Sequence, residues 1–392
     1  MAWKTLGEVA QYINGRAFKP NEWEDNGLPI IRIQNLTGST EICNRTTKTY
    51  EEKYLVVDGD LLFACSASLG AYVWHGESGW LNQHIFKIVP YEGTDKQYLY
   101  YYLLHVVDQL YAKTHGSGMV HITLKPFKDT EIYMPSLSEQ HRIVSHIESL
   151  FAKLDEAKEK AQAVVDGFEL RKSAILHKAF MGELTERWRK EHGVGMESWK
   201  IVLFNDCIQK MQNGLAKRSG SIGESYVVLR LANLSEDGFD TSNLREILLD
   251  EKEQETYSLL ENDVIMIRVN GSKDNVGRQL LVPDVKKWAF CDHIIRIRYQ
   301  NNILPDYMVL FSKSDNYRTY VKDHMVSSAG QNTISRKGIA NMAVPVPECD
   351  EQKEIVRTLS VLFNKEQQAK EAAEVVLTQI DTMKKAILAR AF

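Results

Sequence analysis

No stretch of this sequence is long and apolar enough to span a lipid bilayer, which takes roughly 18 to 20 consecutive apolar residues. The opening residues, Met1 to Leu6, lack the charged and apolar regions of a secretory signal peptide. Cysteine is also scarce: the five thiols lie far apart and form no C-x-x-C pair, which argues against a zinc site and against a disulfide framework. These absences predict a cytoplasmic protein with reduced cysteines, no metal centre and no membrane association.

Motifs that carry common nucleotide and methyl-transfer chemistry are missing too. The sequence has no G-x-x-x-x-G-K-[ST] phosphate loop, no G-x-G-x-x-G dinucleotide motif and no N-P-P-[FY] motif of amino-methyltransferases. Residues 305–306 (Pro-Asp) and 351–353 (Glu-Gln-Lys) loosely resemble a P-D…E-x-K nuclease pattern, but they lie far apart and the second coincides with the start of a predicted helix. We therefore expect a non-catalytic chain with no cofactor.

The overall charge gives only a weak signal. With 48 basic and 52 acidic residues the formal net charge is −4, whereas binding to phosphates requires Lys and Arg. A local basic face can still bind nucleic acid when the acidic residues lie elsewhere. At 392 residues, 44% hydrophobic and 26% charged, the chain is expected to fold into two or three globular units.

The feature that is present, and that decides the predicted architecture, is an internal repeat. Residues 116–180 align with residues 328–392 at a constant offset of 212 and without a gap. Within this stretch Gln140 matches Gln352, and Phe180 matches Phe392. Chance does not readily produce such a match, so the chain is expected to consist of one unit written twice.

Upstream of this stretch the halves are less alike, but the same landmarks recur in order. Trp3 corresponds to Trp199, residues 14–15 (Asn-Gly) to 213–214, residues 31–36 to 229–234, and His84 to His293. Short β-like runs separated by turn residues fill both regions, and a helix is expected over 96–114, which predicts two copies of an α+β domain. The paired histidines have no carboxylate or cysteine cluster in register, so a structural role is favoured, with a DNA contact as the alternative.

Each domain is followed by a predicted long helix with a heptad seam. Apolar or small residues recur in alternating steps of four and three, from Ile143 to Phe168 and again from Ile355 to Ile387, interrupted only by Glu366. Neither helix is apolar all round, so the two are expected to pack on each other. The expected seam residues are Ile147, Leu150, Leu154, Ala157, Ala161, Leu359, Leu362, Ala369 and Ala373.

These patterns divide the chain into five predicted segments. They are a first domain over 1–135, a first long helix over 136–181, a linker over 182–198, a second domain over 199–347 and a second long helix over 348–392. The linker assignment rests on two glycines among charged residues.

The sequence resembles the specificity (S) subunits of type I restriction-modification systems. Their P-x-L-x-E-Q pattern, which opens a long helix, stands at residues 135–140 and, less perfectly, at 347–352. The strand motif lies at 31–36, the helix end K-S-A-I-L at 172–176, and the G-x-x-Q-x-x-I turn is represented by G-Q-N-T-I at 330–334, whereas the first copy departs from that turn at 118–122. Each motif alone is weak, but their double occurrence at matching positions is specific.

The resemblance implies both a fold and a role. The implied fold is two target-recognition domains separated by two long antiparallel helices, which form a coiled coil with pseudo-two-fold symmetry. The implied role is to read a split, asymmetric site in double-stranded DNA, one half per domain. The subunit would also seat two methyltransferase (M) subunits and, through them, the restriction (R) subunits.

The candidate DNA contacts are basic and amide side chains, because Arg pairs with guanine, and Asn or Gln with adenine. Basic residues are in local excess between Val264 and Arg298. Many of these side chains are expected to contact phosphates or to be structural, because phosphate and sugar take most protein–DNA hydrogen bonds. The candidates are Arg16, Lys19, Arg32, Gln34, Asn35, Ser117, His121, Lys217, Arg218, Arg230, Asn233, Arg268, Asn270, Lys273, Arg278, Gln331, Asn332 and Arg336.

A second class of function stays open at this point. A repeat-built coiled-coil scaffold could use the same paired domains to bind a partner other than DNA. Neighbouring genes for an N-P-P-[FY] methyltransferase and a helicase-nuclease would favour the DNA-specificity hypothesis over this alternative.

Overall fold

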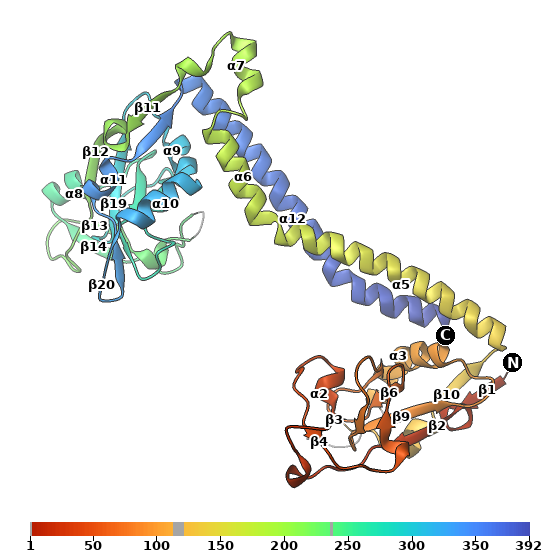
Figure 1. Ribbon diagram of the computed structural model, residues 1–392. Helices are drawn as coiled ribbons and strands as arrows, with labels where there is room; N and C mark the ends of the chain where they lie inside the picture. Colours follow the sequence, from red (N-terminus) through yellow and green to blue (C-terminus); the bar gives the residue numbers. More distant parts are fainter. Residues whose placement is uncertain (1, 113–120, 236–237) are drawn as a thin grey trace. The chain divides into compact units, whose positions relative to one another are not determined.

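The computed structural model describes residues 2–112, 121–235 and 238–392 (Figure 1). The chain divides into two compact units: unit 1 comprises residues 1–163 and 373–392, and unit 2 comprises residues 164–372. Each unit contains one α+β domain together with parts of both long helices, so the predicted fold class is confirmed. Across the described ranges, no helix is long and apolar enough to cross a membrane.

The domain of unit 1 is built on a four-stranded antiparallel sheet in the order β2-β9-β6-β7. All four residues of β6 are buried, and helix α3 packs its tyrosines and leucines into the same core. A second sheet, β4-β3-β8-β5, contains the parallel pair β3–β8, and β1 pairs with β10. The strands are β1 (Ala2–Thr5), β2 (Ala10–Asn14), β3 (Leu28–Ile31), β4 (Arg45–Thr46), β5 (Leu55–Val56), β6 (Leu61–Ala64), β7 (Gly70–Val73), β8 (Gly79–Leu81), β9 (Ile85–Pro90) and β10 (Glu131–Met134). The helices are α1 (Leu6–Val9), η1 (Pro20–Glu22), α2 (Ile33–Leu36), η2 (Glu52–Tyr54), α3 (Lys96–Ala112) and α4 (Leu124–Lys128).

The domain of unit 2 repeats this plan. Its main sheet runs β12-β19-β15-β17, a second sheet runs β14-β13-β18 with β13 and β18 parallel, and β11 pairs with β22. A further small sheet, β16-β21-β20, carries a hairpin. The strands are β11 (Lys200–Leu203), β12 (Ile208–Asn213), β13 (Glu224–Leu229), β14 (Glu246–Leu249), β15 (Val264–Ile267), β16 (Val269–Asn270), β17 (Gln279–Leu281), β18 (Trp288–Phe290), β19 (Ile294–Tyr299), β20 (Val326–Ser328), β21 (Gln331–Thr333) and β22 (Ala343–Val346). The helices are η4 (Phe204–Cys207), η5 (Leu231–Asn233), α8 (Glu251–Tyr257), α9 (Pro305–Phe311), α10 (Asp315–His324) and α11 (Arg336–Ala340).

Strand pairing fixes how the two domains correspond. Trp3 pairs with Tyr133, and Ile201 pairs with Pro345, which lies 212 positions after Tyr133. Trp3 therefore corresponds to Ile201, and the predicted match of Trp3 with Trp199 is wrong by two residues. Trp199 belongs instead to the segment that leads into β11.

The glycine that follows β2 and β12 is required by a close approach of two backbones. A Cβ atom on Gly15 would lie 2.0 Å from the carbonyl oxygen of Asn82, and one on Gly214 would lie 2.0 Å from that of Cys291. Real Cβ atoms do not approach an oxygen so closely, because the atoms would overlap. The repeated Asn-Gly pair thus marks the same crossing of backbones in both domains.

A buried glutamine ties each long helix to its own domain. The Nε2 of Gln140 donates to the carbonyl oxygens of Pro135 and Gly93 at 2.9 and 3.0 Å. Its Oε1 accepts from the amide of Asp95 at 2.8 Å. Gln352 makes three equivalent bonds at 2.8–2.9 Å. Because both buried side chains are fully hydrogen-bonded, the repeated P-x-L-x-E-Q pattern serves as a polar anchor at the start of each long helix.

The first long helix is interrupted, whereas the second is continuous. Helix α5 (Leu137–Asp166) and helix α6 (Phe168–Phe180) are divided at Gly167, in contrast to the single helix expected over 136–181. Helix α12 runs unbroken over Cys349–Ala391. Glycine is the poorest helix former after proline, and the position that matches Gly167 in α12 is Gln379, a good helix former.

The long helices pair in antiparallel fashion inside each unit. In unit 1 the Lys384 ammonium lies 2.6 Å from a carboxylate oxygen of Asp155 and 5.1 Å from the centre of the Phe151 ring. In unit 2 Arg171 donates to Glu366 at 2.7 Å. In unit 2 Phe168 lies by Lys370 and Arg171 by Glu366, and in unit 1 residues 142–146 lie by 390–391 whereas Asp155 lies by Lys384, so residue numbers fall along α12 as they rise along the helix it faces. Glu366, the charged residue that interrupts the predicted seam, is therefore neutralised by an ion pair with Arg171 of the facing helix.

The predicted seam residues differ in their burial. Ile147, Ala161, Leu359 and Ala373 are buried, whereas Leu150, Leu154, Ala157 and Leu362 are half-buried. Ala369 is exposed, and the neighbouring Lys370 takes its place, with its ammonium 4.7 Å from the ring centre of Phe168. Leu362, Glu366 and Lys370 are spaced by two successive steps of four, so the strict heptad that placed Ala369 in the seam is broken at this point.

Each unit is completed by the end of the helix that follows the other domain. Phe392, at the end of the second long helix, lies against Tyr98 and Tyr102 of α3 at ring-centre distances of 5.2 and 5.4 Å. Its repeat partner Phe180 lies against Tyr307 and Phe311 of α9 at 5.4 and 5.1 Å. The repeat of Ala-Phe at residues 179–180 and 391–392 therefore reflects one aromatic contact made twice.

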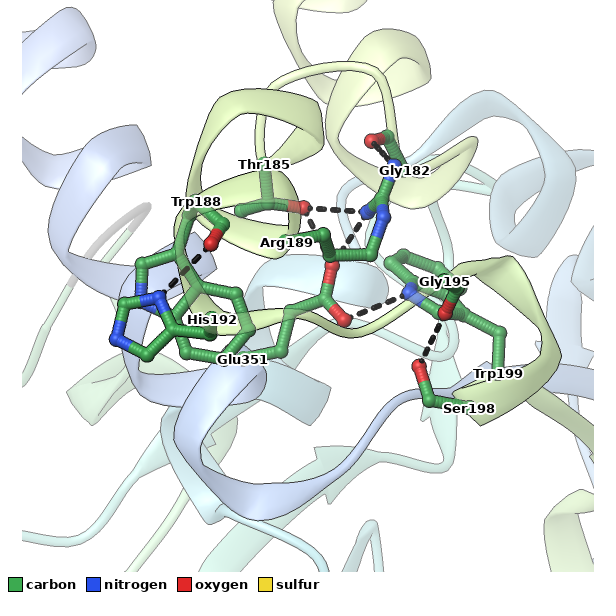
Figure 2. A network of polar contacts seen from close by, with 9 residues as sticks. All are labelled: Gly182, Thr185, Trp188, Arg189, His192, Gly195, Ser198, Trp199 and Glu351. Carbon is green, nitrogen blue, oxygen red and sulfur yellow. Dashed lines mark hydrogen bonds and ion pairs between the residues drawn. The ribbon is translucent and has the colours of Figure 1, made fainter.

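The segment expected as a linker is folded. It contains α7 (Glu186–His192) and η3 (Met196–Ser198), and Arg189 from α7 reaches the buried carboxylate of Glu351 at the start of α12 (Figure 2). Glu351 also accepts from Thr185 Oγ1 at 2.6 Å and from Trp199 Nε1 at 2.9 Å. Residues 182–199 thus form a docked part of unit 2.

Candidate nucleic-acid interface

A short loop that follows the parallel strand is built in the same way in both domains. In unit 1 the amide of Arg32 donates to Asn35 Oδ1 at 3.0 Å, and in unit 2 the amide of Arg230 donates to Asn233 Oδ1 at 3.1 Å. The Nδ2 of Asn233 donates to two carbonyl oxygens further along its loop, at 2.9 and 3.2 Å, and that of Asn35 does so at 3.3 and 3.4 Å. Asn233 is also only 1% exposed. Both asparagines are therefore framework residues of the loop, and the geometry leaves the buried Asn233 no free donor for a base edge.

The arginines at the start of these loops have guanidinium groups that are not neutralised. Arg32 lies 5.7 Å from the ring centre of Trp23, and Arg230 donates to the carbonyl of Asn243 at 2.8 Å. Neither side chain forms an ion pair with a carboxylate within the described part of the chain. Arg230 and His293 line one cavity. In unit 1, burial lowers the pKa of His84, and the nearby charges of His121 and Arg32 lower it further. Arg32 and His121 therefore both lie near His84 in unit 1.

The other candidate side chains of the first domain differ in whether contacts within the domain already hold them. Arg16 donates to Glu22 at 2.9 Å and lies 3.9 Å from the ring centre of Tyr50, so it is held within the domain. Lys19 and Gln34 are exposed. Ser117 lies outside the described residues.

Three candidates of the second domain lie together in the small sheet β16-β21-β20. Asn332 is buried: it accepts from Ser327 Oγ at 2.6 Å and donates to the carbonyl oxygens of Asn270 and Gly271 at 3.3 and 2.8 Å. Gln331 is exposed beside the two-residue turn of the hairpin. The hydrogen bonds of Asn332 therefore stabilise this hairpin, whereas the side chain of Gln331 is open to solvent. In the first domain, an isolated β-bridge pairs Ser66 with His121. These two residues correspond to Val269 and Thr333, which pair in the second domain.

The remaining candidates are spread over unit 2. Arg268 donates to the carbonyl of Asp292 at 3.2 Å, Arg278 to Asn275 Oδ1 at 2.8 Å, and the exposed Arg336 to the carbonyl of Met211 at 3.0 Å. Lys273 is exposed. Lys217 pairs with Glu253, and Arg218 is exposed. Of these, Lys217 and Arg218 line one cavity together with Arg230.

Sequence reasoning missed Arg245 of the loop before β14, which lines the same cavity. Its Nη2 donates to the carbonyl of Arg218. Arg245 lies outside the basic stretch between Val264 and Arg298, and only the pairing of β14 with β13 brings it beside Arg230. A count of local charge along the chain has no signal for such a contact.

Comparison with known families identifies this arrangement. The family model described as the type I restriction modification DNA specificity domain matches residues 1–165 and 228–375. The chain belongs to this family. The two matched stretches start in the two repeated domains and run into the long helices, so the predicted family resemblance is confirmed.

Individual members of the specificity family cover almost the whole chain. The type I restriction enzyme StySPI specificity subunit of Salmonella potsdam is 28% identical over 100% of this chain and 88% of its own length. The EcoKI specificity subunit of Escherichia coli K12 is 25% identical over 99% of this chain and 87% of its own length. The crystal structure of the HsdS subunit from Thermoanaerobacter tengcongensis matches with a TM-score of 0.66 at 17% identity and covers 100% of this chain and 96% of its own. That last likeness shows a shared fold.

Proposed function

We propose that this chain reads a bipartite, asymmetric site in double-stranded DNA, with one half-site read by each repeated domain. The proposed modules are residues 1–135 and 199–347. The main observation in support is that one domain framework occurs twice, down to the same Arg-Asn loop, the same glycine crossing and the same glutamine anchor.

The residues that differ between the two copies favour two different half-sites. The side chain of Asn35 donates to the carbonyl oxygens of residues 40 and 42, which lie five and seven positions later. The side chain of Asn233 donates to those of residues 240 and 243, seven and ten positions later, so the two loops differ in length. Residues that read bases must differ when the bases differ, whereas residues that hold the loop can stay the same. We therefore place base reading on exposed side chains of the loops and the hairpin, such as Gln34, Lys273 and Gln331, and leave the buried Asn233 and Asn332 out of it.

We also propose that the chain is a non-catalytic scaffold for two methyltransferase subunits and, through them, for restriction subunits. Membership of the specificity family supports this role, and so does the likeness, at a TM-score of 0.62 and 17% identity, to a chain studied for complex assembly and conformational transition of the type I R-M system. The missing phosphate-loop and N-P-P-[FY] motifs agree with chemistry carried by the partners.

A domain exchange tests the reading proposal. Residues 1–135 are replaced by those of a relative with another specificity, the complex is expressed in a host, and methylated sites are mapped by sequencing. One half of the methylated site should change while the other half stays as it was. A change in both halves, or no DNA methylation that depends on this chain, would count against independent reading and would favour a scaffold for another partner.

The assembly and catalysis proposals need separate measurements. The chain purified alone should show no methyl transfer, ATP hydrolysis or DNA cleavage, and turnover by the isolated chain would contradict this. Native mass spectrometry of the chain with its methyltransferase should give two methyltransferase subunits per chain, and any other ratio would contradict the proposed scaffold.

A further inference from the structure

A cavity of about 240 Å³ in unit 2 gathers positive charge around an apolar floor. The buried side chains of Leu215, Val228 and Ile247 form part of this floor. The cationic groups that line the cavity are Lys217, Arg218, Arg230 and Arg245, and the acidic residue that lines it is Asp292. Because Lys217 is paired with Glu253, the three arginines against the one carboxylate of Asp292 make the cavity electropositive.

The arginines in this cavity are held in place mainly by backbone carbonyl groups. Arg230 donates through Nη2 to Asn243, and Arg245 donates through Nη2 to Arg218. The Nε of Arg230 is buried and has no hydrogen-bond partner within the described residues. Lys217, by contrast, pairs with Glu253. Among the residues that the structure describes, the three guanidinium groups therefore keep unpaired donors and most of their charge.

This cavity does not suit a metal cation. Cys291, Asp292 and His293 could each offer a ligand atom, and these atoms lie within 4.8 Å of one another. However, they share the cavity with Arg230 and Arg245, whose charges repel a metal ion. A thiol at Cys291 is also a poor ligand while protonated, and burial raises its pKa. An anion with several acceptor oxygens suits the arginines, because their planar forks match phosphate geometry.

The position of Arg230 is repeated in the first domain. Arg32 starts the same Asn-held loop, and it lies beside His84 as Arg230 lies beside His293. The Nδ1 of His84 is buried without a partner within the described residues. Domains that read different sequences share groups that do not depend on sequence, and the DNA backbone is the part of the duplex that both half-sites have in common.

We propose that this cavity binds a backbone phosphate of the DNA duplex, with Arg218, Arg230 and Arg245 as its ligands, and that it positions the second domain on DNA without reading a base. The proposal rests on the proposed DNA-reading function and adds a defined, sequence-independent contact to it. Arg32 in the first domain is the matched phosphate contact.

The test measures DNA binding of the full chain in complex with its methyltransferase, by fluorescence anisotropy over a series of salt concentrations. Two labelled duplexes are used, one with the methylated site and one without it. The main variant is Arg218→Gln, because this exposed side chain has no described partner whose loss would disturb the fold. Arg245→Gln is the second variant, and Lys200→Gln, which removes an exposed charge on β11 away from the cavity, is the matched control.

Loss of one phosphate contact lowers the slope of log affinity against log salt by about 0.9, which corresponds to about five- to tenfold weaker binding near 0.1 M salt. Arg218→Gln and Arg245→Gln should each show this loss on both duplexes, and the methylated sequence should stay the same. Added inorganic phosphate, at constant ionic strength, should weaken the wild-type complex more than it weakens Arg218→Gln.

The possible results separate the two proposals. Salt-dependent binding by the wild type with no greater loss in Arg218→Gln than in Lys200→Gln would overturn the phosphate site and leave the DNA-reading function intact. A loss on the specific duplex alone would overturn it as well, because the arginine would then read a base. No binding of either duplex by the wild-type complex would instead overturn the DNA-reading function, and the phosphate site with it.

Discussion

The buried ion pair between Arg189 and Glu351 offers a sharp test of what holds residues 182–199 to the second long helix (Figure 2). Arg189 is 5% exposed and Glu351 is 1% exposed. Replacing Arg189 with Met removes the positive charge and the ion pair with Glu351. It also removes two hydrogen bonds of the guanidinium group, one to Thr185 Oγ1 at 3.0 Å and one to the carbonyl of Gly182 at 2.6 Å. The Glu351 carboxylate then stays buried, and Thr185 and Trp199 are its remaining donors in the described part of the chain.

The expected cost follows from this burial. Removing one partner of a buried ion pair costs about 3 to 5 kcal/mol, because the remaining charge is left in a poorly solvated place. Since two donors to Glu351 survive, we expect a value near the lower end, about 3 kcal/mol. At about 1.4 kcal/mol per tenfold change, local opening should become about 100- to 200-fold more frequent.

Amide hydrogen exchange measures this opening directly in the full chain. The amides of Arg189 and Val194 are hydrogen-bonded inside the docked segment, at 2.9 and 3.0 Å, and should lose protection. Arg187→Met is the matched control on the same helix: Arg187 pairs with Glu191 at side-chain exposures of 91% and 55%, and such surface pairs contribute about 0.3 to 0.5 kcal/mol.

A double variant completes the test. Adding Glu351→Gln to Arg189→Met removes the stranded charge, so the double variant should be more protected than Arg189→Met alone. If Arg189→Met raised exchange no more than Arg187→Met, or if the double variant were the least protected of all, the ion pair would not be the contact that holds this segment.

Three further predictions concern the fold. Ala161→Leu combined with Ala373→Leu should destabilise the helix pair of unit 1 by about 1 to 3 kcal/mol in denaturant unfolding, because larger side chains overpack a buried contact; unchanged stability would place these alanines outside it. Gly214→Ala should strongly lower the melting temperature of the full chain, because its Cβ would meet a carbonyl oxygen at 2.0 Å, whereas Gly271→Ala has its nearest neighbour at 3.8 Å and should be tolerated; equal effects would contradict the crossing of backbones. Because burial lowers the pKa of His84 in the folded state, the unfolded chain binds a proton first as pH falls below 6.5; stability should therefore drop there, and a His84→Gln variant should drop less in melting curves recorded across pH.

The repeat made much of the architecture predictable, because each landmark could be checked against its own copy. The matched Gln140 and Gln352 prove to be the same buried anchor, and the matched Ala161 and Ala373 are buried alike. The division at Gly167 was not predicted, because one glycine in a strong helical pattern is often tolerated.

The roles of polar residues were harder to predict than the fold. Asn35 and Asn233 were candidates for base contacts because of their residue type, but their amides hold a loop. Sequence does not distinguish these roles, since an asparagine that caps a turn and one that reads adenine use the same donor and acceptor. The docking of residues 182–199 escaped notice because Arg189 and Glu351 are far apart in the chain and look like surface charges.

The exchange of helix ends between the two halves has a consequence for synthesis. Unit 1 needs residues 373–392, which leave the ribosome only after the whole of unit 2. At about 5 to 20 residues per second, roughly 210 residues take about 10 to 40 s. During that time Tyr98 and Tyr102 lack the ring contact that Phe392 makes with them in the finished chain. The domain made first is therefore the one that is completed last.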